Sequence, residues 1–288
     1  MKVSEIIKNK KVTVSCELFP PKLGSKLPEA KKVVAEMALL KPDFMSVTYG
    51  AGGGTRQTTI DIADCIQNEN GVPAIAHLTC VSSDTPKIEY ILTRFKELGI
   101  KNILALRGDI PENSDVTLPD EYQHANDLVD KIKSFGDFCV GGACYPEGHP
   151  ESSTLEADIE NLKRKVDSGC EFLTTQMFFD NNILYSYLLK LLRAGINIPI
   201  IAGIMPITNT KQLQRTCSLS GSIVPRRFKA IADRFGDSPE AMKQAGIAYA
   251  TDQIIDLIAN GVNNIHIYTM NHPDVAGKIM DNLSTIIR

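Results

Sequence analysis

The sequence lacks several features that mark particular protein classes. It has no tryptophan, only 6% of its residues are aromatic, and its 31 Lys and Arg residues do not outnumber its 34 Asp and Glu residues. Nucleic acid is therefore not expected as a principal partner, because duplex binding depends on a surplus of basic side chains that neutralise phosphates. The remaining composition, 43% hydrophobic and 23% charged, is typical of a globular chain with a large core.

Long apolar runs and a leader segment are also missing. The longest runs, such as Ile198–Ile204, fall far short of the roughly 20 residues that a membrane-spanning helix needs. The N-terminal segment Met1–Lys11 contains neither the apolar stretch nor the small-residue cleavage site of a secretory leader. We therefore expect a cytoplasmic protein that does not use a membrane as a partner.

The seven cysteines show no pairing pattern. No two are separated by the two residues that typify zinc and redox pairs, and an odd number argues against a disulfide framework. His77 with Cys80, and Cys144 with His149, are the nearest approaches to metal pairs, but each lacks two further ligands at sensible spacing. We predict no metal site.

Short β-branched runs alternate with longer segments of helical period along the chain, which is typical of parallel βα units. Strands are predicted at Thr13–Leu18, Phe44–Thr48, Ala74–Thr79, Asn102–Leu106, Cys139–Ala143, Phe172–Gln176, Ile198–Ile204 and Asn263–Tyr268. Helices are predicted at Pro28–Leu40, Thr58–Gln67, Pro86–Leu98, Tyr122–Phe135, Thr154–Ser168, Asn181–Ala194, Ser238–Asn260 and Pro273–Ile287. Eight βα units in a chain near the roughly 250 residues typical of the fold predict one α/β domain, a (β/α)8 TIM barrel spanning residues 1–288.

A doubly wound sheet is the rival architecture. Such sheets usually have five or six strands and often carry a glycine-rich turn after the first strand. Here the first strand is followed by Phe19-Pro20-Pro21-Lys22, which favours the barrel. The segment from Leu213 to Pro239 breaks the helical pattern and is predicted to be an elaborated loop after the seventh strand.

In a barrel of this kind, reactive residues lie at the C-terminal ends of the strands. Glu17 is the first candidate, because it is a carboxyl group in an otherwise apolar strand, where burial favours the protonated form that a general acid needs. A salt-bridged strand end is the alternative for Glu17, and a turn-forming loop residue is the alternative for Asp109. His77 is either a core histidine or a ligand contact at the mouth.

Two further segments suit phosphate or ribose recognition. Residues 48–56, which include Gly50, Gly52, Gly53 and Gly54, resemble a phosphate-binding loop but match neither the dinucleotide pattern nor the P-loop pattern. A flexible loop that closes over a ligand explains these glycines equally well. Asp158, Asn161 and Lys165 share one face of the helix after the fifth strand, which suits ribose and diphosphate, although a solvated face is the alternative.

Nine segments together resemble one family over the whole chain. They are Ser15–Lys22, Ser46–Ala51, His77–Cys80, Leu104–Asp109, Ala143–Pro150, Asn161–Lys165, Thr175–Asp180, Gly203–Pro206 and Tyr268–Asn271. In this order they are similar to the bacterial single-domain 5,10-methylenetetrahydrofolate reductases. The resemblance implies a flavin barrel that binds FAD and reduces methylenetetrahydrofolate to 5-methyltetrahydrofolate by hydride transfer. It also implies NAD(P)H or an iron–sulfur partner protein as the electron source, and we expect a homo-oligomer.

The resemblance assigns roles to individual residues. Glu17 matches the general acid that opens the folate bridge, and Asp109 matches a carboxylate beside the pterin and the flavin. Gln176 and Gln212 match folate contacts. The positions that match FAD contacts, Asp109 among them, are Thr48, His77, Arg107, Gly108, Asp109, Ala143, Tyr145, His149, Asp158, Asn161, Arg164 and Lys165.

One departure from the family pattern bears on the electron donor. Many members carry an aromatic residue shortly after the match to Gln212, where it stacks against the pyridine nucleotide or the folate; this chain has Leu213, Thr216 and Cys217 there. Alternative functions are a flavin barrel that oxidises a cyclic amine such as proline, the catalytic subunit of an iron–sulfur electron-transfer complex, and a cofactor-free binding protein.

Overall fold

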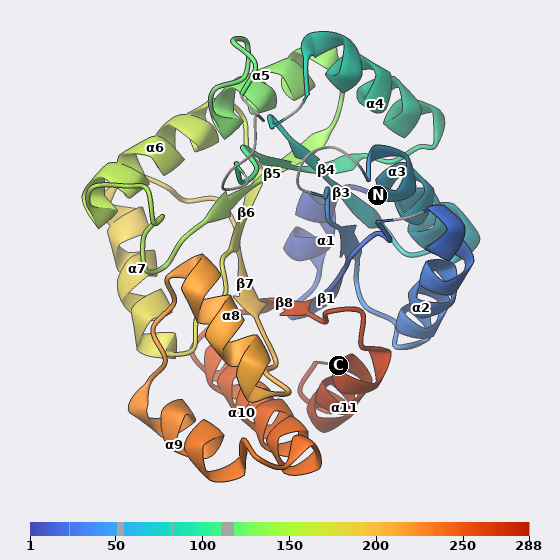
Figure 1. Cartoon of the computed structure of the whole chain (residues 1–288). Coiled ribbons are helices and arrows are strands. Elements are labelled where there is room, and N and C mark those ends of the chain that lie inside the picture. Colours follow the sequence, from blue (N-terminus) through green and yellow to red (C-terminus); the bar gives the residue numbers. More distant parts are fainter. Residues whose placement is uncertain (23, 51–54, 82, 111–117, 288) are drawn as a thin grey trace.

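The computed structural model describes residues 1–22, 24–50, 55–81, 83–110 and 118–287. Eight parallel strands in this part of the chain form a closed barrel in sequence order, with β8 paired to β1. They are β1 (Thr13–Leu18), β2 (Met45–Val47), β3 (Ala74–Thr79), β4 (Asn102–Leu106), β5 (Cys139–Cys144), β6 (Phe172–Thr175), β7 (Ile200–Ile204) and β8 (Asn264–Tyr268). The predicted (β/α)8 barrel is therefore confirmed, and Figure 1 shows these strands at the centre of a ring of helices.

The helices pack their apolar faces against the barrel. They are α1 (Val3–Asn9), α2 (Leu27–Leu39), α3 (Arg56–Asp64), α4 (Thr85–Glu97), α5 (Ala125–Phe135), α6 (Leu155–Asp167), α7 (Asn181–Arg193), α8 (Thr210–Ser220), α9 (Arg226–Phe235), α10 (Pro239–Ala259) and α11 (Pro273–Leu283), with the short helices η1 (Gly24–Lys26) and η2 (Cys65–Glu69). In α4, for example, Ile88, Ile91, Leu92 and Phe95 are fully buried, as their spacing of three and four residues predicts. Of the described helices, none is long and apolar enough to cross a membrane.

Helix α1 closes the N-terminal end of the barrel and was not predicted from the sequence. The amide N–H of Val3 donates to Oδ1 of Asn102, at the start of β4, over 2.8 Å. Val3 and Ile6 pack onto a ring of strand residues, namely Phe44, Ile75, Leu104, Cys139, Phe172 and Ile201. The described residues therefore fill this end of the barrel, which leaves the C-terminal end of the strands for a ligand to approach.

The predicted loop between Leu213 and Pro239 is wrong, because this segment contains α8 and α9. The serines that seemed to break the pattern are accommodated in the helix: Oγ of Ser220 donates to the carbonyl of Thr216 over 2.9 Å. Helix α8 ends at Gly221, which has a left-handed φ of 71° that favours glycine. Apolar positions on the two helices, among them Leu213 and Phe228, pack against residues that follow β6 and β7.

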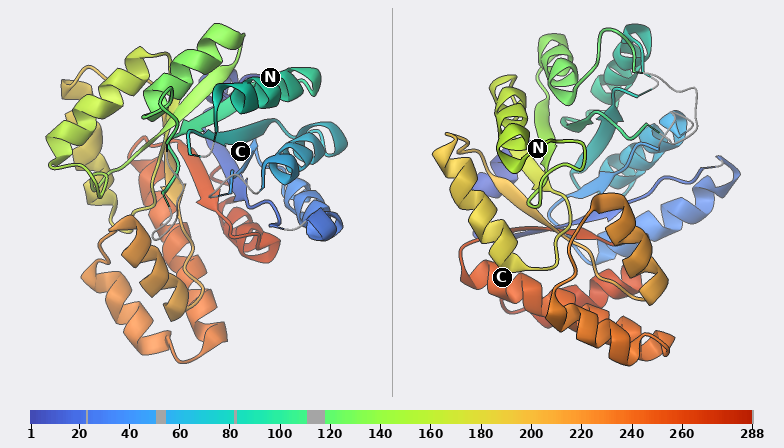
Figure 2. Two further views of the ribbon diagram at one scale, coloured as in Figure 1. Left: turned by 45° about the horizontal axis from the view of Figure 1, so that its top comes forward. Right: turned by 60° about the vertical axis from the view of Figure 1, so that its left-hand side comes forward.

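Figure 2 shows α8, α9 and α10 as a group of helices that extends from one side of the barrel. Contacts of α10 with both α9 and α7 join this group to the helical ring. Apolar residues of the three helices pack with Phe179, Met205 and Ile207, so the group lies next to the C-terminal ends of β6 and β7, at the end of the barrel that α1 leaves open.

Candidate active site

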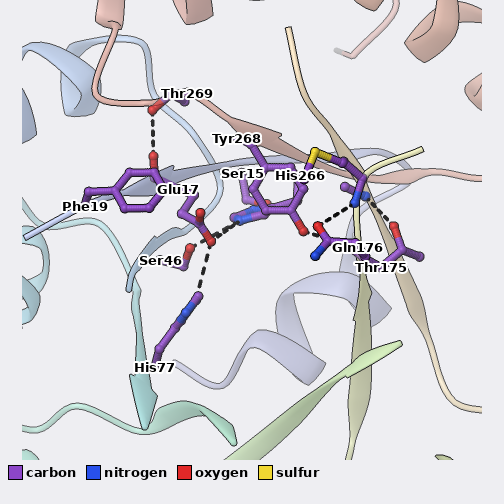
Figure 3. A network of polar contacts seen from close by, with 12 residues as sticks. Ser15, Glu17, Phe19, Ser46, His77, Thr175, Gln176, His266, Tyr268 and Thr269 are labelled. Carbon is purple, nitrogen blue, oxygen red and sulfur yellow. Dashed lines mark hydrogen bonds and ion pairs between the residues drawn. The ribbon is translucent and has the colours of Figure 1, made fainter. Parts of the chain in front are cut away.

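A buried carboxyl group lies inside the barrel near its open end. Glu17, in β1, is only 6% exposed. Its Oε2 lies 3.7 Å from Nε2 of His77 in β3 and 3.8 Å from Nε2 of His266 in β8 (Figure 3). Both histidines are buried as well. The structure therefore brings together two residues that the sequence singled out, Glu17 and His77, and adds a third.

His266 is held by two serines. Its Nδ1 lies 2.8 Å from Oγ of Ser15, and that hydroxyl donates its single proton to the carbonyl of Ile265 over 3.0 Å. Nδ1 of His266 therefore donates to Ser15, and Nε2 lies 3.2 Å from Oγ of Ser46. These contacts fix the ring so that Nε2 faces the Glu17 carboxyl group.

His266 was not predicted from the sequence, although its strand contains the signal. Successive residues of a strand point to opposite faces, so Asn264, His266 and Tyr268 lie on one face of β8. A polar side chain at every second position of a barrel strand indicates a polar interior at that height. This alternation, and not the end of the strand, indicates His266.

His77 is uncharged at neutral pH. Burial lowers its pKa to about 4, and the opposing effect of the Glu17 charge is smaller. Its Nε2 is buried and has no hydrogen-bond partner among the described residues. A buried polar atom without a partner costs free energy, so this nitrogen is available to a ligand at the mouth.

Strands β6 to β8 form the other side of the mouth. The hydroxyl of Tyr268 donates to the carbonyl of Thr175 over 2.5 Å, and a Cβ on Gly203 would lie 2.5 Å from both that carbonyl and the Tyr268 ring. Glycine at 203 therefore makes room for the ring. Oε1 of Gln176 accepts from the amide of Met177 over 3.0 Å, and no hydrogen bond among the described residues uses its Nε2. That amino group can meet a polar ligand.

The loops after β4 and β5 carry charged and aromatic groups. Arg107 forms a two-pronged ion pair with Glu151, with N–O distances of 2.5 and 2.6 Å. Gly108 has a φ of +86°, and a Cβ there would lie 3.1 Å from Thr79, so the position requires glycine. Asp109 is exposed.

Two rings of the β5–α6 loop pack against each other. The rings of Tyr145 and His149 lie edge to face with centroids 4.6 Å apart. Burial raises the pKa of the Tyr145 hydroxyl to about 12, and the charge of Asp109 adds to this effect. The phenol is therefore neutral at physiological pH and can donate a hydrogen bond to a ligand in the loop.

Lys165 extends from α6 to the end of β5. Its Nζ donates to the carbonyl of Ala143 over 2.8 Å, and its side chain fills the space that a Cβ on Gly142 would occupy. Burial lowers the pKa of the ammonium group, although nearby groups including Asp158 oppose this effect. An ammonium group has three donors, and among the described residues only the Ala143 carbonyl accepts from it. The unused donors suit an anionic ligand.

The other predicted residues of α6 are divided between two environments. Asp158 is buried and accepts from Oγ of Ser152 over 3.1 Å, close to Lys165. Asn161 and Arg164 are exposed, and the structure gives Arg164 no contact with this group. Of the three residues predicted to share a face, Asp158 and Lys165 lie close together near β5, and Asn161 is exposed.

Two predicted residues have contacts within the protein itself. The amide of Thr48 donates to the carbonyl of Leu18 over 3.0 Å, at the end of β2. Oε1 of Gln212 accepts from the amide of Thr208 over 2.9 Å, and its Nε2 donates to the carbonyl of Pro206 over 3.3 Å. Gln212 thus fixes the start of α8. Residues 51–54 of the predicted phosphate-binding loop lie outside the described residues.

The chain matches a protein-family model described as methylenetetrahydrofolate reductase over residues 2–284. The 5,10-methylenetetrahydrofolate reductase of Pectobacterium carotovorum subsp. carotovorum is 36% identical over 273 residues, which cover 95% of this chain and 90% of that protein. The enzyme of the same name from Escherichia coli (strain K12) is 36% identical over 272 residues, with 94% and 90% coverage. The maize protein named methylenetetrahydrofolate reductase (NADH) 1 is 36% identical over 298 residues, covering 99% of this chain and 50% of that protein.

Solved structures with little sequence identity share the fold. A Clostridium thermocellum protein that binds two copies of 5-methyl-5,6,7,8-tetrahydrofolic acid superposes with a TM-score of 0.64 at 12% identity, covering 99% of both chains. Dihydropteroate synthase from Xanthomonas albilineans gives a TM-score of 0.54 at 14% identity, covering 96% of this chain and 91% of that one. At these identities the similarity concerns the fold alone.

The lowered pKa of His77 predicts a pH dependence of stability. Between pH 6.5 and about 4, the unfolded chain binds a proton on His77 that the folded chain excludes. The free energy of unfolding should therefore fall as the pH drops through this window, by up to about 1.4 kcal/mol per pH unit from this one group. His77→Asn should remove that contribution, and urea unfolding from pH 7 to pH 4.5 measures it. The exposed control His272→Asn should keep the wild-type slope; parallel curves for wild type and His77→Asn would refute the assignment.

Proposed function

The chain belongs to the methylenetetrahydrofolate reductase family and is an oxidoreductase that reduces 5,10-methylenetetrahydrofolate, and we propose that Glu17 supplies the proton and bound FAD the hydride for this reaction. The observation that carries the proposal is the Glu17 carboxyl group, buried at the open end of the barrel between His77 and His266. Among the described residues, these two histidines are its partners at ion-pair distance. A general acid must hold its proton out of bulk water until the substrate arrives, and the barrel interior encloses the Glu17 carboxyl group.

The proposed role of Glu17 is to open the one-carbon bridge between N5 and N10 of the folate. Its proton goes to N10 of the substrate, and the electron pair of the bond between N10 and the bridging carbon moves to N10. The bridging carbon is then part of a cation centred on N5, which accepts a hydride to give the 5-methyl product. Asp109, at the end of β4, offers a negative charge that would stabilise this cation. The side-chain amide nitrogen of Gln176, Nε2, would donate a hydrogen bond to the pterin ring.

The described residues fit a flavin dinucleotide at this mouth. Lys165 has unused donors beside Asp158, which suit a diphosphate and a ribose. Nε2 of His77 is buried without a partner, and Gly108 lets the backbone approach a ring closely. Bound FAD would supply the hydride. We propose that the whole chain forms one FAD-binding domain, held by the residues that match the family's cofactor contacts.

The electron source of the enzyme is proposed to be NAD(P)H or an iron–sulfur partner protein. The residues of α8 shortly after Gln212 include Leu213, Thr216 and Cys217, none of which can stack on a nicotinamide as an aromatic ring does. The absence of an aromatic side chain here favours a partner protein or another stacking residue. A cytoplasmic homo-oligomer stays a prediction.

Glu17→Gln tests the acid directly. The variant keeps the shape of the side chain but has no proton to give, so reduction of methylenetetrahydrofolate by the chemically reduced enzyme should fall about 10²–10⁴-fold. Flavin content and flavin reduction should be unchanged, and stopped-flow absorbance measures each half-reaction separately. The exposed control Glu160→Gln should behave as the wild type. Folate turnover near the wild-type rate in Glu17→Gln would remove Glu17 from this role.

Lys165→Met tests the cofactor site. It removes a charged donor while keeping an apolar stem of similar length, so the dissociation constant for FAD should rise about tenfold or more. Flavin fluorescence titration of the apoprotein measures the constant, and a thermal unfolding curve shows whether the variant is folded. The matched control is Lys163→Met, since Lys163 lies on the same helix but pairs with Asp167 at the surface. Equal FAD affinities in the two variants would return Lys165 to a purely structural role.

A further inference from the structure

Helix α8 and the linker that follows it contact the loops after β6 and β5 at the barrel mouth. The helix begins beyond β7, where Asn209 caps it by accepting from the amide of Gln212 over 2.8 Å. The linker that follows it, residues 221–225, reaches the loops after the two neighbouring strands. Oγ of Ser222 donates to the carbonyl of Met177, directly after Gln176, over 3.0 Å. The helix is therefore fixed at both of its ends.

The second contact of the linker is made by Glu147. Its Oε2 accepts the backbone N–H of Ile223 over 2.9 Å. Glu147 lies in the turn between Tyr145 and His149, where the amide of Gly148 donates to the carbonyl of Tyr145 over 2.9 Å. One carboxyl group thus joins the loop proposed to hold the cofactor to the end of the helix that carries Gln212.

The Glu147 carboxyl group is partly buried and lies close to other groups of the mouth. Its Oε1 is buried and has no hydrogen-bond partner among the described residues. Burial raises the pKa of the carboxyl group, while the hydrogen bond from Ile223 lowers it and the charge of Asp180 raises it further. Cys217, on the inner side of α8, lies close enough for Glu147 to raise its pKa, although burial contributes more. The protein therefore keeps a half-buried acid at a point where burial disfavours its charge.

We propose that Glu147 is a positioning residue for the folate site, because its hydrogen bond to the Ile223 amide holds the C-terminal end of α8 against the barrel mouth. The proposal rests on the proposed function, since the folate is the ligand that α8 would cover. In this role Glu147 acts through α8, by its hydrogen bond to the Ile223 amide. Loss of the hydrogen bond should free the linker and weaken substrate binding, while the reaction of bound substrate continues.

The first test measures the contact itself in the full-length protein. In Glu147→Ala, hydrogen–deuterium exchange of peptides covering residues 218–226 should be about tenfold faster than in the wild type, because the hydrogen bond that holds the Ile223 amide is lost. Exchange in peptides from α4 should stay the same. Glu147→Gln keeps an acceptor oxygen for Ile223 and should restore slow exchange. Unchanged exchange at 218–226 in Glu147→Ala would overturn the proposal.

The second test measures the consequence for the reaction. Glu147→Ala should raise KM for methylenetetrahydrofolate about tenfold, with kcat within about twofold of the wild type and unchanged flavin content. Glu147→Gln should restore KM, and the exposed Glu160→Ala should have no effect. A variant that is faster in exchange but normal in KM would overturn the positioning role. So would an equal loss of kcat, flavin content and thermal stability, which a general structural defect produces.

A second substitution removes the donor of the hydrogen bond between Ile223 and Glu147. Ile223→Pro removes the N–H group and leaves Glu147 in place, and the Ile223 side chain itself is 63% exposed. It should raise KM as Glu147→Ala does, and it keeps the proposal testable if Glu147→Ala does not fold. A normal KM in Ile223→Pro would count against the proposal. A wild-type protein that does not reduce methylenetetrahydrofolate at all would instead overturn the proposed function.

Discussion

A carboxyl group buried inside a closed β-barrel is the feature on which the rest of this site depends. Burying Glu17 costs free energy unless the group is neutral or paired, and the interior around it supplies polar neighbours that are themselves held in place. The two serines orient His266, and the hydroxyl of Thr269 donates to the Glu17 backbone carbonyl over 2.6 Å, which fixes the end of β1. Among the described residues, α1 packs on apolar strand residues at the N-terminal end of the barrel, so the acid faces the C-terminal end.

The mouth has two sides, and different residues shape each of them. On the β4–β6 side, glycines at 108 and 142 leave room for a close ligand approach and for the Lys165 stem. On the β6–β8 side, Gly203 makes room for the Tyr268 ring, and α8 lies alongside. The Arg107–Glu151 pair spans the loops after β4 and β5. This division matches the proposed assignment of one side to the flavin and the other to the folate.

The sequence predicted the barrel because eight apolar strands alternate with amphipathic helices, and both periodicities are local. The sequence also singled out Glu17 and His77 as candidate site residues, because polar residues at strand ends converge in this fold. It missed α1, a helix of seven residues that is stable only because Val3 and Ile6 pack onto the strands. A loop was wrongly predicted over α8 and α9, because these helices too are stabilised by packing against distant residues. Contacts between distant segments, such as Glu147 with Ile223, leave no pattern in the sequence.

The most direct test of the central claim is the anaerobic absorbance spectrum of the purified protein through one turnover. The account predicts the bands of oxidised flavin, which disappear on chemical reduction and return when 5,10-methylenetetrahydrofolate is added, with one equivalent of 5-methyltetrahydrofolate formed. A protein without flavin absorbance after supply of FAD would contradict the account. A reduced flavin that stays reduced in the presence of the folate would contradict it equally.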